Sequence, residues 1–145
     1  PPGGCIADMK ISYKNLSLVF AAGCLGGLAN SLAVWSFGAL GLTKALGVQL
    51  APALTPGWLY PRLVWGGIWG ILFLLPLPRL SMIVQGLILS LGPTLAQLFL
   101  VFPLAAHKGV LGLQLGPLTP ALVIFFNVVW GITAGLWLKL TEASK

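Results

Sequence analysis

Residues 16–40 read LSLVFAAGCLGGLANSLAVWSFGAL, an apolar stretch that contains no charged side chain. A helix needs about 20 mostly apolar residues to cross a bilayer. Residues 80–106 and 109–138 are also free of charge, and within residues 45–78 only Arg62 is charged. We therefore predict four transmembrane helices, at Leu16–Leu40, Pro56–Leu75, Leu80–Leu104 and Pro120–Leu138.

The composition of the whole chain agrees with a membrane environment. Of the 145 residues, 58% are apolar and only 7% are charged, and the mean hydropathy is +1.00. Soluble domains carry about 25% charged residues, so the composition excludes a soluble globular domain and a disordered chain. The continuous apolar run LFLVF at residues 98–102 lacks the alternation of β-barrel strands. We predict an all-α integral membrane protein.

The basic residues indicate topology and not nucleic-acid binding, although the net charge is +6. Lys and Arg gather in the loops of membrane proteins that stay in the cytoplasm. With four helices, both termini lie on one side, and that side carries more basic residues than the other. This bias favours a bacterial inner-membrane protein with both termini in the cytoplasm. The terminal side holds Lys10, Lys14, Arg79, Lys139 and Lys145, and the opposite side holds Lys44, Arg62 and Lys108.

The sequence also repeats itself. The string QLAPALTP at residues 49–56 returns as QLGPLTP at 114–120, and VWG at 64–66 returns 65 positions later at 129–131. These matches predict a tandem duplication of a two-helix hairpin. Two crossings per hairpin give both copies the same orientation, related by a pseudo-twofold axis along the membrane normal. The predicted organisation is a tail at 1–15, hairpins at 16–75 and 80–140 joined by a turn at 76–79, and a second tail at 141–145.

Three short strings resemble a known family. LAQLF at residues 95–99, FPL at 102–104 and LTP at 118–120 are similar to a stretch of the YagU-like bacterial inner-membrane proteins. The resemblance implies the same membrane. We carry no activity and no residue role over from it.

Small residues recur at a spacing of four in every predicted helix. Helices in lipid associate through close backbone approach and interhelical hydrogen bonds, so such residues mark contact faces. The faces serve either the packing of one four-helix bundle or the association of several chains. The small residues are Gly23, Gly27 and Ser31, then Gly66 and Gly70, then Gly86, Ser90 and Thr94, and finally Gly131 and Gly135.

A few polar residues lie inside the predicted helices at similar depths. Arg62 and Asn127 occupy equivalent positions of the two repeats, and Asn30 and Gln97 lie at comparable distances from their helix ends. In one interpretation the amides hydrogen-bond between helices and Arg62 extends to the headgroups. In the other, these four residues form a polar vestibule around Arg62. Its counter-charge is then a lipid phosphate, an anionic solute or an acid on a partner.

The sequence offers no set of residues for catalysis. Its two acids, Asp8 and Glu142, lie in the terminal segments, and His107 stands in a loop beside Lys108. Neither a metal site nor a cofactor site is predicted, and we do not expect an enzyme. We predict a non-catalytic accessory subunit that packs against membrane lipids and against partner membrane proteins or itself. The alternative is a small transporter, channel or lipid-handling protein for a neutral or anionic solute.

Overall fold

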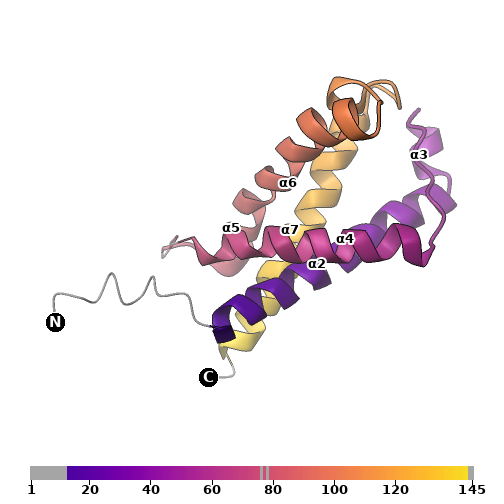
Figure 1. Ribbon diagram of the computed structural model, residues 1–145. Helices are drawn as coiled ribbons and strands as arrows, with labels where there is room; N and C mark the ends of the chain where they lie inside the picture. Colours follow the sequence, from indigo (N-terminus) through magenta and orange to yellow (C-terminus); the bar gives the residue numbers. More distant parts are fainter. Residues whose placement is uncertain (1–12, 76, 78, 144–145) are drawn as a thin grey trace, which may run out of the picture.

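The computed structural model describes residues 13–75, 77 and 79–143. Most of the predicted tail at 1–15, part of the turn at 76–79 and the end of the tail at 141–145 lie outside the described residues. The described chain is helical and has no β-strand, which confirms the predicted all-α class. Its elements are α2 (Tyr13–Ala39), α3 (Leu42–Ala45), α4 (Pro56–Gly70), η1 (Ile71–Leu74), α5 (Met82–Leu89), α6 (Leu91–Ala96), η2 (Gln97–Ala105), η3 (Val110–Gly112) and α7 (Thr119–Ala143) (Figure 1).

Among the described residues, three helices are long and apolar enough to cross a membrane, as expected of an integral membrane protein. They are Tyr13–Ala39, Met82–Ala105 and Thr119–Thr141, with mean hydropathies between 1.7 and 2.0. The helix predicted at Pro56–Leu75 forms as α4, whose regular part has 15 residues, followed by the 3-10 helix η1. Leu75 has an extended conformation, with φ −63° and ψ 136°. The following residue is Pro76, which disfavours helix at the position before it.

The start of α4 follows the capping rules for helices. The Thr55 hydroxyl accepts a hydrogen bond from the Trp58 amide at 3.3 Å, and Pro56 takes the first helical position, where no amide donor is needed. α7 begins at Thr119, but this hydroxyl donates to the Gly116 carbonyl at 2.8 Å. The equivalent Thr-Pro pairs therefore stand at the start of both helices and use different hydrogen bonds.

The long helix at Met82–Ala105 is divided into three elements. α5 ends before Ser90, α6 runs to Ala96, and η2 is a π-helix with i→i+5 hydrogen bonds. Pro93 lies in α6 and Pro103 in η2, and neither has an amide hydrogen to donate to the preceding turn. The division near Pro93 agrees with the kink that Gly92-Pro93 predicts.

α2 lies at the centre of the bundle, between α4 and α7, and α5 packs on the other side of α7. Glycine allows the close approach of these helices, because a β-carbon at Gly23 would collide with the Gly66 carbonyl. In the same way, a β-carbon at Gly86 would collide with the Gly131 carbonyl. The predicted contact residues thus lie in helix contacts within one chain. Those with such contacts are Gly23, Gly27, Gly66, Gly70, Gly86, Ser90, Gly131 and Gly135, while Ser31 accepts a hydrogen bond from α4.

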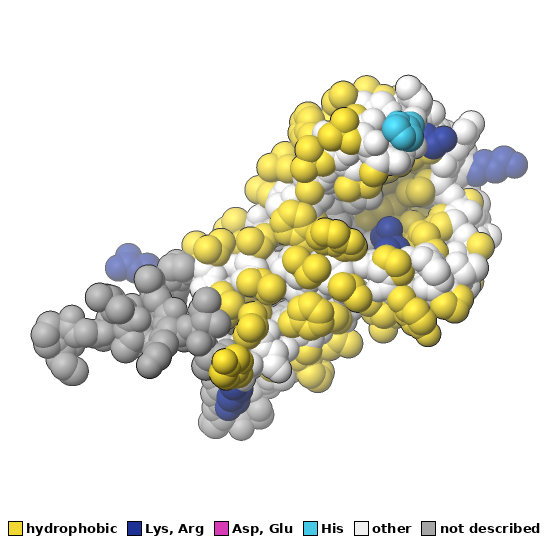
Figure 2. Space-filling view, viewed as in Figure 1, with side chains coloured by type: hydrophobic (Ala, Val, Ile, Leu, Met, Phe, Trp, Pro, Cys, Tyr) yellow, Lys and Arg dark blue, Asp and Glu magenta, His cyan; other side chains and the backbone are white. Residues whose placement is uncertain are grey.

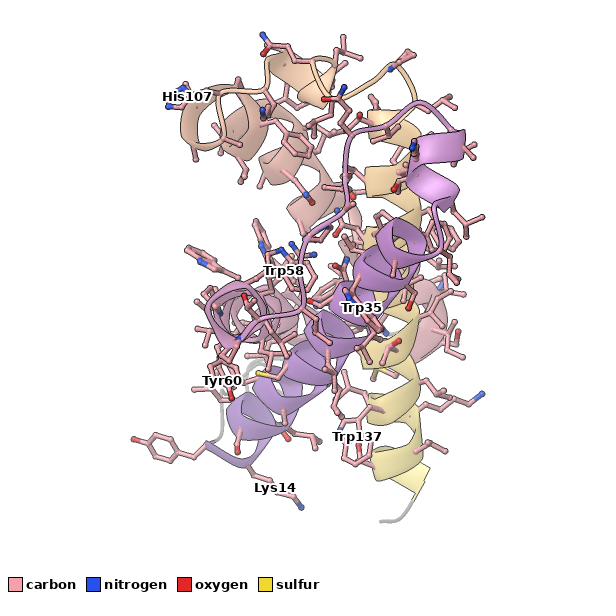
Figure 3. All side chains as sticks on the ribbon, turned by 90° about the vertical axis from the view of Figure 1, so that its right-hand side faces the viewer. Lys14, Trp35, Trp58, Tyr60, His107 and Trp137 are labelled. Carbon is pink, nitrogen blue, oxygen red and sulfur yellow. The ribbon has the colours of Figure 1, made fainter. Side chains whose placement is uncertain are left out.

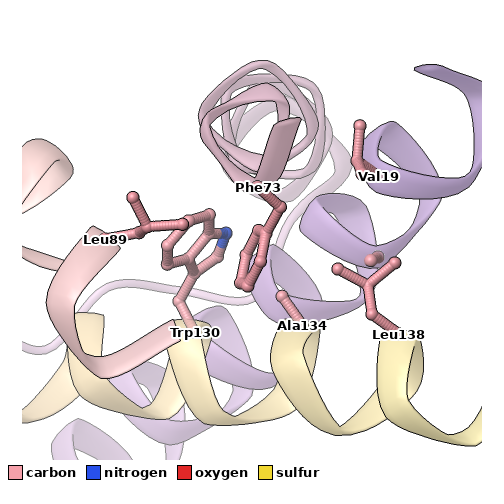
Figure 4. Packing of buried hydrophobic residues seen from close by; sticks show 7 residues of the cluster. Val19, Phe73, Leu89, Trp130, Ala134 and Leu138 are labelled. Carbon is pink, nitrogen blue, oxygen red and sulfur yellow. The ribbon is translucent and has the colours of Figure 1, made fainter. Parts of the chain in front are cut away.

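The main apolar core lies where α2, η1, α5 and α7 meet (Figure 4). Trp130 of α7 is 3% exposed, and its ring centre lies 6.1 Å from that of Phe73. Its indole nitrogen lies 3.2 Å from the Gly23 carbonyl and 3.3 Å from the Gly66 carbonyl. Trp130 therefore joins α7 to the crossing of α2 and α4.

The two connecting segments lie side by side at one end of the bundle. The Gln49 amide donates to the Leu115 carbonyl at 2.9 Å, and a β-carbon at Gly116 would collide with the Gly47 carbonyl. The start of α2 and the end of α7 both lie at the other end of the bundle (Figures 1 and 3).

Candidate functional site

The four residues of the predicted vestibule lie on four different elements and form one hydrogen-bond network. Asn30 comes from α2, Arg62 from α4, Gln97 from the start of η2 and Asn127 from α7. Hydrogen bonds connect Arg62 to Asn30, Asn30 to Asn127, and Asn127 to Gln97. The network therefore crosses the whole bundle at one level.

Arg62 points from α4 toward α2. Its Nε donates to the Ser31 hydroxyl at 2.9 Å, and its Nη2 donates to Asn30 Oδ1 at 2.6 Å. The guanidinium also lies 4.7 Å from the ring centre of Trp58, one turn earlier on α4. Figure 3, which shows α4 nearly end-on, places Trp58 and Tyr60 on different sides of this helix. A guanidinium has five N–H donors, and three of them have no acceptor among the described residues.

Asn30 connects the charged side chain to the rest of the network. Its oxygen accepts from Arg62, and its nitrogen donates to the Phe126 carbonyl at 2.7 Å and to Asn127 Oδ1 at 3.2 Å. The side chain is 7% exposed, and each of its polar atoms has a partner. A buried amide satisfied in this way holds α2, α4 and α7 in one arrangement.

Asn127 extends the network to the helix that contains Pro93. Its nitrogen lies 3.1 Å from the Thr94 hydroxyl and 3.4 Å from Gln97 Oε1. The Thr94 hydroxyl in turn donates to the Ser90 carbonyl at 2.7 Å. Asn127 and Thr94 are both buried, and Gln97 is half-buried.

The network borders a cavity of about 630 Å³ between α4 and the α6–η2 segment. Figure 2 shows the hollow in the surface between these two parts of the molecule. Its walls are mostly apolar, and its polar residues are those of the predicted vestibule. The lining consists of Gly27, Asn30, Pro61, Arg62, Trp65, Gly66, Trp69, Pro93, Ala96, Gln97, Leu100, Val101, Ala105, Asn127 and Trp130.

The cavity exists because α4 and α6 approach each other at one end only. A β-carbon at Gly92 would contact Trp69 and Leu72, so the two helices meet near the start of η1. Away from that point they diverge toward the connecting segments (Figure 1). Trp65, on the open side of α4, is 59% exposed.

Sequence reasoning did not identify every member of the network. Ser31 and Thr94 were interpreted as packing residues, but their hydroxyls accept hydrogen bonds from Arg62 and Asn127. Trp58 was not assigned to the site, although its position four residues before Arg62 was the available signal for a contact on one helix face.

The described residues contain no group of three or more His, Cys, Asp or Glu side chains that would suit a metal ion. No acidic side chain pairs with Arg62 within that part of the chain. Asp8 lies outside the described residues, and nothing is described of the Glu142 side chain.

The fold and the site together define a helical protein of the integral membrane class with an open, mostly apolar cavity that Arg62 lines. No known family model, curated protein or solved structure matches this chain.

Proposed function

We propose that this protein binds an anionic amphiphile, a molecule with a phosphate or carboxylate headgroup and an apolar chain, with the headgroup at Arg62. The proposal rests on one observation above all. Arg62 has N–H donors without acceptors among the described residues, and it lines a mostly apolar cavity in a chain with helices long and apolar enough to span a membrane. Handling of such a lipid-like molecule, by binding or by passage, is the function that this site supports best.

The electrostatic cost of Arg62 supports an anionic ligand. A guanidinium stays charged at physiological pH, and a charged side chain at the centre of a membrane helix costs about 2.5–3.5 kcal/mol on insertion scales. Trp58, Ser31 and Asn30 contact the guanidinium, but none of them carries a negative charge. An anionic headgroup would compensate the positive charge of Arg62 and accept hydrogen bonds from its free N–H groups.

The depth of Arg62 depends on whether α4 crosses the membrane. α4 and η1 together measure about 30 Å, taking the rise per residue of α- and 3-10 helices. This length equals the hydrocarbon thickness of a typical bilayer. We propose that α4 with η1 is the fourth span, and that both termini lie on the cytoplasmic side of a bacterial inner membrane.

Recurring helix contacts support the proposed tandem repeat. Gly23 meets Gly66 in the first hairpin, and Gly86 meets Gly131 in the second. The second helices are related by a shift of 65 positions (Gly66 to Gly131), but the first helices by 63 (Gly23 to Gly86). By its contacts, the equivalent of Gly27 is Ser90 and not Gly92, because Gly27 packs on Gly66 and Ser90 packs on Gly131. Each π-helical turn of η2 holds about one extra residue, which accounts for the change from 63 to 65.

The repeat carries one charge and not two. Arg62 bonds Ser31 in the first hairpin, and Asn127 bonds Thr94 at the equivalent position of the second. Only the first pair offers a cation, so we propose a single headgroup position in the chain.

An accessory subunit is the second candidate, and the same free N–H donors favour it. A carboxylate of a partner membrane protein would satisfy Arg62 as a headgroup does. Because the small-residue faces are occupied within the chain, such a partner, or a second copy, would have to enter at the cavity or pack on other faces.

Tryptophan fluorescence provides a direct test of amphiphile binding. Trp65, Trp69 and Trp130 line the cavity, so a bound amphiphile with bromine atoms on its chain should quench their fluorescence. We would titrate the full chain in neutral detergent with a dibrominated fatty acid, a dibrominated lysophosphatidic acid and a dibrominated monoacylglycerol. We expect saturable quenching by one or both anionic probes at concentrations where the neutral probe has little effect.

Substitution of Arg62 completes the test. Arg62→Gln should weaken binding of the anionic probes about tenfold or more, because it removes charge-assisted hydrogen bonds. Arg62→Lys should retain part of the affinity, since it keeps the charge but loses the planar donor geometry. Arg79→Gln is the matched control, because Arg79 is exposed and outside the cavity lining. Equal binding by wild type, Arg62→Gln and Arg62→Lys would refute the proposal and favour the accessory subunit.

A further inference from the structure

We infer that the Gln97 amide nitrogen is a second headgroup donor, so that the anion bridges Arg62 on α4 and Gln97 on η2 across the cavity. This inference rests on the proposed function and deepens it. It adds a ligand-contacting residue on the opposite wall and requires a headgroup that accepts hydrogen bonds from both side chains.

The direction of the hydrogen bonds follows from Arg62, because a guanidinium only donates. Asn30 must therefore present its oxygen to Arg62, and its nitrogen faces the Phe126 carbonyl, which only accepts. The two neighbours agree on one orientation of the Asn30 amide.

This orientation determines the next amide in turn. The Asn30 nitrogen also faces Asn127, which must present its oxygen. The Asn127 nitrogen then needs acceptors, and it has the Thr94 hydroxyl and Gln97 Oε1. Thr94 can serve as the acceptor because its own hydrogen goes to the Ser90 carbonyl.

Gln97 is the last member of this chain of donors. With its oxygen engaged by Asn127, its two N–H donors have no acceptor among the described residues. Gln97 and Arg62 both line the cavity, from η2 and from α4. The free polar hydrogens thus belong to two side chains that line the same cavity from opposite walls.

A cavity end of this kind selects its ligand by hydrogen-bond type. A carboxylate or a phosphate ester offers only acceptors to Arg62 and Gln97, and gains charge-assisted bonds. A quaternary ammonium group by itself offers no acceptor and is repelled by the positive charge of Arg62. The cavity volume of about 630 Å³ lies within the range of pockets for one small molecule. We therefore expect a single-chain anion, with its chain along Trp65, Trp69 and Leu100.

Two substitutions of Gln97 test the inference in the fluorescence titration. Gln97→Glu keeps an oxygen for Asn127 but replaces the free donor with a negatively charged acceptor. Gln97→Met keeps the length and removes both polar atoms. We expect binding of the dibrominated fatty acid or lysophosphatidic acid to weaken about tenfold or more in Gln97→Glu and severalfold in Gln97→Met. Gln114→Glu, an exposed glutamine outside the cavity lining, should bind as wild type does.

The outcomes separate this inference from the proposed function. Loss of binding in Gln97→Met and Gln97→Glu, with Gln114→Glu unchanged, supports the bridge. Wild-type affinity in Gln97→Met, together with loss in Arg62→Gln, would overturn the bridge and leave the proposed function intact. Binding that is insensitive to Arg62 would overturn both. Gln97→Met keeps the test decisive if the charge in Gln97→Glu prevents folding.

Discussion

At the scale of single residues, Asn30 is the most constrained polar side chain of the site. It accepts from Arg62 and donates to Phe126 and Asn127 while it is 7% exposed. Because these partners belong to α4 and α7, one amide orients the side chains of two neighbouring helices. Loss of this amide would leave several buried groups without partners.

We therefore predict that Asn30→Leu destabilises the folded protein by about 1–3 kcal/mol, the cost of unsatisfied buried polar groups. Unfolding by sodium dodecyl sulfate, followed by circular dichroism, measures the change. Gln114→Leu is the control, because this glutamine is exposed. A midpoint for Asn30→Leu equal to that of the control would show that the network contributes little to stability.

At the scale of the elements, glycine determines how close two helices approach. A β-carbon at Gly66 would meet the Gly23 carbonyl and the Gly27 backbone, and these atoms belong to a helix that cannot shift like a flexible side chain. Gly57, in the first turn of the same helix, has open space around it. Gly66 and Gly57 thus lie on the same helix but differ in their surroundings, and they form a matched pair for substitution.

We predict that Gly66→Val forces α2 and α4 apart and lowers stability by about 1–3 kcal/mol or more, as overpacking does. The separation should also disturb the Arg62 to Ser31 bond, which crosses the same helix pair. Gly57→Ala should be neutral or slightly stabilising, since alanine favours helix over glycine. Thermal unfolding in detergent compares the variants, and equal stability of Gly66→Val and Gly57→Ala would contradict the close packing of α2 on α4.

At the scale of the whole molecule, the two hairpins share contacts but not surroundings. Trp130 is 3% exposed and donates to the α2–α4 crossing, while its sequence counterpart Trp65 is 59% exposed beside the cavity. α2 and α7 pack along their lengths, whereas α4 and α6 meet near one end. In the proposed repeat, the pair α4 and α6 corresponds to the pair α7 and α2. The first pair is open and leaves the cavity, whereas the second pair is closed.

Topology is a property of this scale, and cysteine labelling tests it. If α4 crosses the membrane, positions 44 and 108 lie on the outer face and position 79 on the inner face. Single cysteines at 44 and 108 should then react with an impermeant reagent in intact cells, and a cysteine at 79 should not. Lys44, Arg79 and Lys108 are exposed positions. The native Cys5 and Cys24 would be replaced by serine or alanine, and lysed cells would show that all three positions can react. Labelling of 44 and 108 on opposite sides would mean three spans, with α4 outside the hydrocarbon.

The sequence by itself was sufficient for the class of fold and the positions of the helices. Apolar runs without charge predict helices in lipid because an unpaired backbone is too costly there. Proline explains two further features, the start of α4 at Pro56 and the divided helix near Pro93. The polar residues Asn30, Arg62, Gln97 and Asn127 were recognisable as candidates because polar side chains are rare in such runs.

Only the tertiary structure decided which of these residues meet and what remains between them. The divergence of α4 from α6 comes from contacts among residues distant in sequence, such as Gly92 with Trp69, and it leaves the cavity open. The hydrogen-bond direction from Arg62 through Asn30 and Asn127 to Gln97 also requires four elements to be in place. Local sequence sets the periodicity of each helix, but the angle and depth at which helices pack depend on long-range contacts that no single stretch contains.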